Sequence, residues 1–150
     1  MTGYGVIDQR GSELFFVACG VIRTTPAKSF PERLQELHTG LGEVIATHRP
    51  AHAAVEDIFT AVNPRSALKL GHARGVLILA LMQAGLVVAE FTPMMVKQAV
   101  AGYGRAPKEQ VQQMVRSLLH LSASPSQDAA DALAVAICLA NHAARPLLKP

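Results

Sequence analysis

Short apolar runs separated by turn residues along the first part of this chain are typical of β-strands. Strands are predicted at residues 3–8, at 14–18 and 20–24 as one bulged strand, at 51–59 and at 86–91. The bulge is expected near Gly20, because an isolated glycine inside a strand pattern often marks one. The last two runs are short and almost continuously apolar, which is typical of strands buried on both faces.

Between and after these strands, apolar residues recur every three or four positions, which is the spacing of an amphipathic helix. Helices are predicted at residues 31–47, 64–84, 93–100, 108–121 and 125–143. Three of the predicted starts combine a cap residue with a proline in the first helical position: Asn63-Pro64, Thr92-Pro93 and Ser124-Pro125. Because strands alternate with helices after the first pair of strands, the chain is predicted to be one α/β domain.

The composition fits a folded domain that does not enter a membrane. The chain has 150 residues, of which 50% are hydrophobic and 17% charged, and this excludes intrinsic disorder. The longest apolar stretch, residues 76–89, is shorter than the roughly 20 residues of a membrane span. Two cysteines are too few for a disulfide framework or a zinc site, so we expect a cytoplasmic protein. The domain is expected at residues 1–143 and a loose tail at 144–150.

Three carboxylates lie where a charged side chain is costly. Glu56 follows an apolar run, and Asp128 and Asp131 open a helix that is apolar on nearly every face. The two aspartates are three residues apart and therefore share one side of that helix. Buried carboxylates repel each other unless a cation binds between them, and oxygen ligands favour Mg²⁺ or Mn²⁺. The alternative is that the aspartates only stabilise the helix N-terminus.

Positive charge is concentrated in the middle of the chain. The whole chain has 14 Lys and Arg against 11 Asp and Glu, but residues 60–120 contain seven basic and two acidic residues. Arg65, Lys69 and His72 share one face of the second predicted helix. Such a surface suits a phosphate backbone, although an ordinary solvated helix face has the same composition. Phe59 is either a core residue or an exposed ring that stacks on a base.

Five segments of the chain, in this order, resemble the RuvC family of Holliday junction resolvases. They are Ala54-Val55-Glu56-Asp57-Ile58-Phe59, then Asn63 with Ser66-Ala67-Leu68-Lys69-Leu70-Gly71-His72-Ala73-Arg74-Gly75-Val76, Val96-Lys97-Gln98-Ala99-Val100, Lys108-Glu109-Gln110-Val111-Gln112-Gln113-Met114-Val115, and Gln127-Asp128-Ala129-Ala130-Asp131-Ala132-Leu133-Ala134-Val135-Ala136. The resemblance extends from Thr2 to about His142. No segment is decisive alone, but the five together are specific.

The resemblance implies an RNase H-like fold, in which helices flank a central mixed sheet. It also implies a Mg²⁺-dependent endonuclease that acts as a homodimer on four-way DNA junctions, beside branch-migration motor proteins. Such enzymes make paired, symmetric nicks near a short thymine-containing sequence. The implied metal ligands are Glu56, Asp128 and Asp131, and the implied neighbours of the scissile phosphate are Lys97 and Lys108. The residues expected to contact DNA are these two lysines, Phe59 as a stacking ring, and Arg65, Lys69 and Arg74 of the basic segment.

The start of the chain differs from the family pattern. Family members begin with a strand that ends in an Ile-Asp-Pro-Gly-like segment before Thr-Gly-Tyr-Gly, and its Asp is a fourth metal ligand. Here the sequence begins at Met1-Thr2-Gly3-Tyr4-Gly5. Our hypothesis is that the recorded start lies about a dozen residues too late, which an upstream reading frame encoding the strand would support. As written, the chain is expected to lack this central strand and to cleave weakly or not at all.

Two other functions stay open from the sequence. A catalytically impaired junction-binding module would bind junctions in a salt-dependent manner without cutting them. A different RNase H-like nuclease would cut an RNA–DNA hybrid or a transposon end instead of a junction. A small-molecule enzyme is disfavoured, because the chain has no cofactor-binding loop of the phosphate-binding or dinucleotide-binding type.

Overall fold

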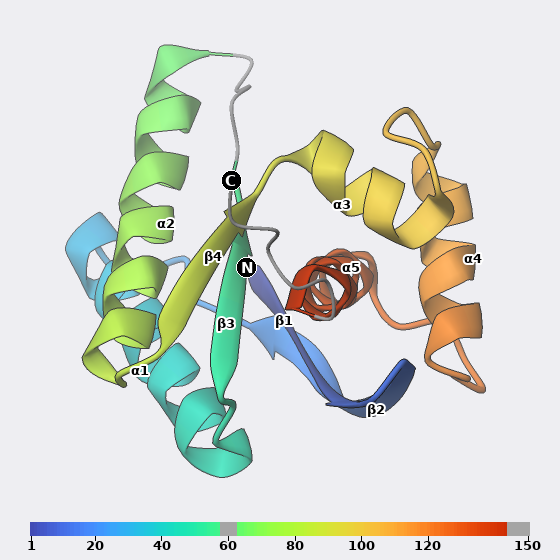
Figure 1. Ribbon diagram of the computed structural model, residues 1–150. Helices are drawn as coiled ribbons and strands as arrows, with labels where there is room; N and C mark the ends of the chain where they lie inside the picture. The colour runs from blue at the N-terminus through green and yellow to red at the C-terminus, as the bar shows by residue number, and fades with distance from the viewer. Residues whose placement is uncertain (58–62, 144–150) are drawn as a thin grey trace, which may run out of the picture.

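The computed structural model describes residues 1–57 and 63–143, and Figure 1 shows the arrangement of its elements. The elements in chain order are β1 (Thr2–Arg10), β2 (Glu13–Ile22), α1 (Phe30–His48), β3 (His52–Glu56), α2 (Pro64–Gln83), β4 (Val87–Phe91), α3 (Pro93–Ala101), α4 (Lys108–Leu118) and α5 (Gln127–Ala143). The predicted α/β class and element order are confirmed. Phe59 and the predicted tail at 144–150 lie outside the described residues.

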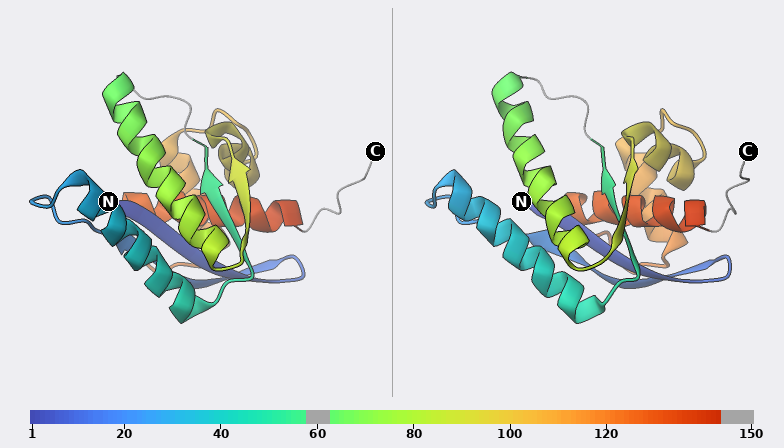
Figure 2. Two further views of the ribbon diagram at one scale, coloured as in Figure 1. Left: turned by 90° about the vertical axis from the view of Figure 1, so that its left-hand side faces the viewer. Right: turned by 60° about the vertical axis from the view of Figure 1, so that its left-hand side comes forward.

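The strands lie between two layers of helices, as the views in Figures 1 and 2 show. Helices α1 and α2 pack against each other on one side, where α1 contacts β2 and α2 contacts β4. Helices α3, α4 and α5 pack together on the other side, and α5 contacts all four strands. Across the part of the chain that is described, no helix is long and apolar enough to cross a membrane.

The described strands form two pairs and not one continuous sheet. β1 pairs antiparallel with β2, and β3 pairs parallel with β4. No hydrogen-bonded ladder connects the two pairs within residues 1–57 and 63–143. The predicted mixed sheet therefore has both kinds of pairing, but in two separate halves that share α5 as a common packing partner.

The bulge in β2 lies at Val17 and not near Gly20, so the predicted position was wrong. Ile7 of β1 is opposite Phe16 and Val6 is opposite Ala18, which leaves Val17 as the extra residue. Gly20 has a different role, because a Cβ there would lie 2.8 Å from the ring of Tyr4 on the neighbouring strand. Its missing side chain makes room for that ring.

β1 lies directly against α5, because two of its residues have no side chain. A Cβ at Gly5 would lie 2.8 Å from the backbone nitrogen of Leu133, and a Cβ at Gly3 would overlap the backbone carbonyl of Asp128. Leu133 and Ile137 of α5 are fully buried in the core. The prediction that this apolar helix is buried is confirmed, and the contact with β1 fixes its first turn.

Two of the three helices predicted from a cap residue followed by proline begin where predicted. The side chains of Asn63 and Thr92 each accept a hydrogen bond from the backbone N–H three residues later, as predicted for α2 and α3. The predicted start of the last helix at Pro125 was wrong. α5 begins at Gln127, and its first turn is closed by a hydrogen bond from the N–H of Ala130 to the carbonyl of Ser126.

Candidate active site

Glu56 is the last residue of β3 and lies at the carboxyl end of that strand. The pairing of β3 with β4 continues one residue further, where the N–H of Asp57 donates to the carbonyl of Phe91 at 2.7 Å. The run of alanines and valine that precedes Glu56 suits a strand covered by helices on both sides. Glu56 is therefore a half-buried carboxylate on a backbone that the neighbouring strand holds in place.

Charged groups from three helices act on Glu56. Burial is the main cause that raises the pKa of Glu56, and the negative charge of Asp131 on α5 raises this pKa further. The positive charges of Lys108 on α4 and Lys97 on α3 lower it. The fold thus gathers four of the five predicted catalytic residues around the end of β3, although they come from four different elements.

Lys108 also forms an ion pair with Asp131. Its Nζ atom lies 3.0 Å from Oδ2 of Asp131, and each side chain is 44% exposed. An ion pair that is so exposed to water adds little to folding stability. We infer that the pair contributes mainly to the charge distribution of the site, since it holds the ammonium group of Lys108 next to the carboxylates of Asp131 and Glu56.

Asp128, the third predicted ligand, is placed differently. It is half-buried in the first turn of α5, where its backbone carbonyl abuts Gly3, and it is not among the groups that shift the pKa of Glu56. In residues 1–57 and 63–143, no three His, Cys, Asp or Glu side chains lie close enough together to hold a metal ion. The described side chains therefore supply a pair of neighbouring carboxylates, with Asp128 three residues away on the same helix.

This arrangement fits a hard divalent cation by the chemistry of its donors. All candidate ligands are carboxylate oxygens, and the repulsion between Glu56 and Asp131 would be relieved by a positive ion. Mg²⁺ in particular is commonly bound through one or two carboxylates, with water and substrate phosphate as its remaining ligands. A pair of protein carboxylates is therefore compatible with Mg²⁺ that binds together with a phosphate-containing substrate.

The basic residues of α2 divide into two groups. Arg65 and Lys69 are exposed, and Lys69 lies 5.9 Å above the ring of Phe30. Arg74 is instead turned towards the strands, where its guanidinium forms ion pairs with Asp57 and Glu90. The sequence pattern missed these partners of Arg74. One signal for them exists, because Arg74 lies seven residues before the buried Leu81 and so shares its inward face.

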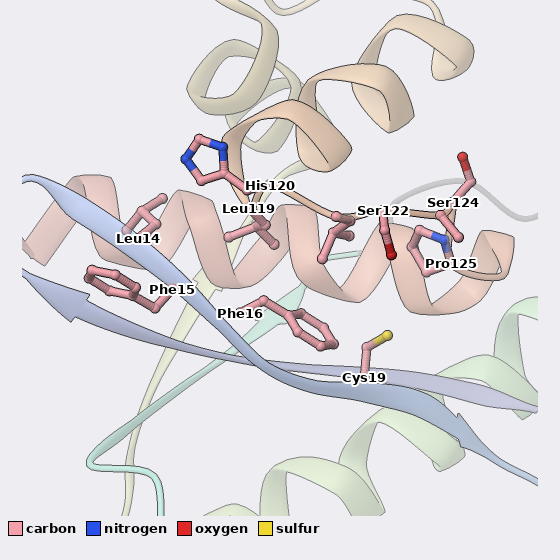
Figure 3. Close-up of a pocket in the computed structure, with 11 residues that line it drawn as sticks. Leu14, Phe15, Phe16, Cys19, Leu119, His120, Ser122, Ser124 and Pro125 are labelled. Carbon is pink, nitrogen blue, oxygen red and sulfur yellow. The ribbon is translucent and has the colours of Figure 1, made fainter.

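A separate pocket of about 550 Å³ lies between β2 and the segment that joins α4 to α5. Figure 3 shows Leu14, Phe15 and Phe16 of β2 on one side of it, with Leu119, His120 and Pro125 opposite. None of the residues that line it is a predicted site residue. The pocket is mainly apolar and lacks carboxylates, so it does not suit metal-dependent chemistry.

Comparison with known proteins identifies the family. The chain matches the family described as "Crossover junction endodeoxyribonuclease RuvC" over residues 1–139. The chain belongs to the RuvC family. The RuvC protein of Citrifermentans bemidjiense is 56% identical over 142 residues, which cover 95% of this chain and 87% of the relative. The RuvC protein of Polynucleobacter asymbioticus is 54% identical over 147 residues, covering 97% and 86%.

Solved RuvC structures have the same fold. The structure of Thermus thermophilus RuvC in complex with a Holliday junction substrate superposes with a TM-score of 0.89 at 38% identity, covering 95% of this chain and 87% of that one. A second Thermus thermophilus RuvC structure gives a TM-score of 0.84 at 37% identity, covering 94% and 87%. The resemblance drawn from the sequence segments is confirmed, and so is the RNase H-like fold of the RuvC family.

Proposed function

We propose that this chain is a Mg²⁺-dependent endonuclease that resolves four-way DNA junctions by paired nicks. The observation that carries the proposal is the meeting of Glu56 and Asp131 with Lys97 and Lys108 at the end of β3. Two carboxylates next to two lysines suit the hydrolysis of a phosphodiester, because the reaction needs a cation site and positive charge beside the phosphate. Membership of the RuvC family supports a junction as the substrate.

The carboxylates and the lysines of the site have different roles in this proposal. Glu56 and Asp131 would hold the cation, with Asp128 as a further ligand from the same helix. Bound Mg²⁺ would supply electrophilic charge at the phosphate and at the attacking water. Lys97 and Lys108 would stabilise the negative charge that grows on the phosphate oxygens in the transition state. The fixed backbone of β3 would keep these groups in place before DNA binds.

The DNA would lie across the basic residues that surround this site. Arg65 and Lys69 are exposed on α2, where they can approach phosphates, and they would add a salt-dependent share of the affinity. Phe59 follows Glu56 by three residues and is proposed as the ring that stacks on a base at the junction. It stays a proposal from the sequence, since it falls outside the described residues.

The function is tested with a synthetic four-way junction and purified protein in Mg²⁺. The expected result is a pair of symmetric nicks in strands of like polarity, with a linear duplex of the same sequence left intact. An RNA–DNA hybrid serves as the control for a different RNase H-like nuclease. Cleavage of the hybrid or of the linear duplex at a rate similar to that of the junction would contradict the proposal.

A second candidate function is junction binding without cleavage. It is favoured by the division of the strands into two pairs and by the limited number of carboxylates that the described residues gather. If this candidate is correct, the affinity of the protein for a junction falls as the salt concentration rises, and no nicks form in Mg²⁺.

We also propose that the protein acts as a homodimer through α2. Leu68, Leu79 and Met82 of α2 are 64%, 52% and 56% exposed. With Gly75 they follow the heptad spacing of a helix–helix seam, and no atom lies within 4 Å of a Cβ placed at Gly75. A second copy of this chain would cover the apolar stripe, and the twofold axis would match two sites to two strands of a junction.

The variant Leu79→Glu is expected to separate the dimer into monomers. A buried charge at the centre of an apolar seam costs about 2 kcal/mol or more, which is roughly a thirtyfold rise in the dimer dissociation constant. The measurement is sedimentation velocity over a range of protein concentrations. Leu70→Glu is the matched control, because Leu70 is 45% exposed on the same helix but lies off the stripe. Equal dissociation of both variants would refute this seam.

A further inference from the structure

Arg74 connects three parts of the fold around the candidate active site. It lies on α2, its side chain is 23% exposed, and its Nε atom donates a hydrogen bond to the backbone carbonyl of Glu56 at 3.1 Å. The same guanidinium pairs with Glu90 on β4 and lies 3.6 Å from Oδ1 of Asp57. One side chain therefore joins α2 to the ends of both strands of the parallel pair.

The contact with Glu56 is made to its backbone and not to its carboxylate. The carboxylate therefore stays available for a cation, while the peptide group that carries it is held from the helix side by Arg74. From the other side, β4 holds the next peptide group through the hydrogen bond between Asp57 and Phe91. The end of β3 is thus fixed between a helix and a strand, directly where Glu56 projects.

The ion pairs of Arg74 also affect the charge near the site. Asp57 and Glu90 both form ion pairs with the guanidinium, through its Nη2 atom. Without Arg74, the carboxylates of Asp57 and Glu90 would lose this positive partner. They would then compete with Glu56 and Asp131 for a bound cation. A planar guanidinium can serve three acceptors at once, which the single ammonium of lysine does less well.

We propose that Arg74 is a positioning residue that holds Glu56 in place for cation binding, and not a residue that contacts DNA. This inference rests on the proposed function, since it concerns the same site. Partners that orient a metal ligand typically change metal affinity or activity by about 10- to 100-fold when they are removed. A small displacement of a reacting group has a similarly large effect on rate.

The test compares Arg74→Ala, Arg74→Lys and Arg65→Ala in three measurements. These are the affinity for Mn²⁺ by calorimetry, the affinity for a four-way junction in Ca²⁺, and the single-turnover nicking rate in Mg²⁺. Arg74→Ala is expected to weaken Mn²⁺ binding at least about tenfold and to leave junction affinity within about twofold. Arg65→Ala is expected to show the opposite pattern, because Arg65 is exposed on α2 and is proposed to bind phosphate.

Arg74→Lys distinguishes positioning from a general effect on folding. Lysine keeps one ion pair, so its thermal unfolding midpoint should stay near that of the original protein, while Mn²⁺ binding stays weakened. The inference is overturned if Arg74→Ala lowers junction affinity as Arg65→Ala does, or if neither Arg74 variant changes Mn²⁺ binding. If the original protein binds Mn²⁺ but makes no nicks, the proposed nuclease function fails while the Mn²⁺ comparison still decides the role of Arg74.

Discussion

Exchange of Glu56 for glutamine is expected to reduce nicking of a four-way junction by at least about a hundredfold. The substitution keeps the size of the side chain and removes only the negative charge that would bind the cation. Junction affinity, measured in Ca²⁺ so that no cleavage occurs, is expected to stay within about threefold, because phosphate contacts through basic residues are unchanged. The measurement is the single-turnover rate of nicking at saturating protein.

The same variant is expected to fold at least as well as the original protein. Burial and the charge of Asp131 both raise the pKa of Glu56, so the ionised carboxylate is held in an unfavourable environment. For a carboxyl whose folded pKa lies above its unfolded value, this cost appears as the pH rises through the folded pKa. Glutamine lacks the cost, and in metal-free buffer at neutral pH its thermal unfolding midpoint should be equal or higher.

Two further variants make the interpretation specific. Asp131→Asn should reproduce the loss of nicking, because Asp131 is the other carboxylate of the pair. Glu109→Gln should leave the rate within about twofold, since surface substitutions outside a site have small effects. Glu109 is exposed on α4 next to Lys108. Its substitution by glutamine removes one negative charge, as the Glu56 variant does. A Glu56→Gln protein that retains more than about a tenth of the original nicking rate would contradict the proposed role of Glu56 in the active site.

Local signals explain which parts of the fold could be predicted from the sequence. Asn63 and Thr92 are followed by proline, and each caps its helix as expected, because a cap depends only on residues within one turn. The apolar pattern of residues 129–140 predicted a buried helix for the same reason. The bulge at Val17 could not be placed in this way, because it depends on which residue of β1 lies opposite.

The site itself depends on contacts between distant segments. Glu56 and Asp131 are 75 residues apart (131 − 56), and no spacing rule connects a strand end to a helix so far along the chain. Family resemblance named both residues, but their electrostatic coupling follows only from the packing of α5 under β3. Hydrophobicity is also an incomplete guide to burial, since the apolar residues Met94 and Met95 of α3 are 59% and 38% exposed.

Substitution of Gly3 by alanine is expected to damage both the fold and the site. A Cβ at Gly3 would overlap the backbone carbonyl of Asp128, and backbone atoms cannot move aside as a flexible side chain can. Either β1 or the first turn of α5 must shift, at a cost of about 3 kcal/mol, the upper part of the usual range for overpacking. Urea unfolding should detect this loss. Nicking should fall as well, because the turn that shifts carries Asp128.

Gly42→Ala is the matched control, and its expected effect on stability has the opposite sign. Gly42 is exposed within α1, and no atom lies within 4 Å of a Cβ placed there. Alanine at such a helical position typically adds up to about 1 kcal/mol of stability. If Gly3→Ala is as stable as the original protein, the close contact between β1 and the first turn of α5 is refuted. If Gly3→Ala is destabilised but nicks at the original rate, the first turn of α5 does not need to be fixed for catalysis.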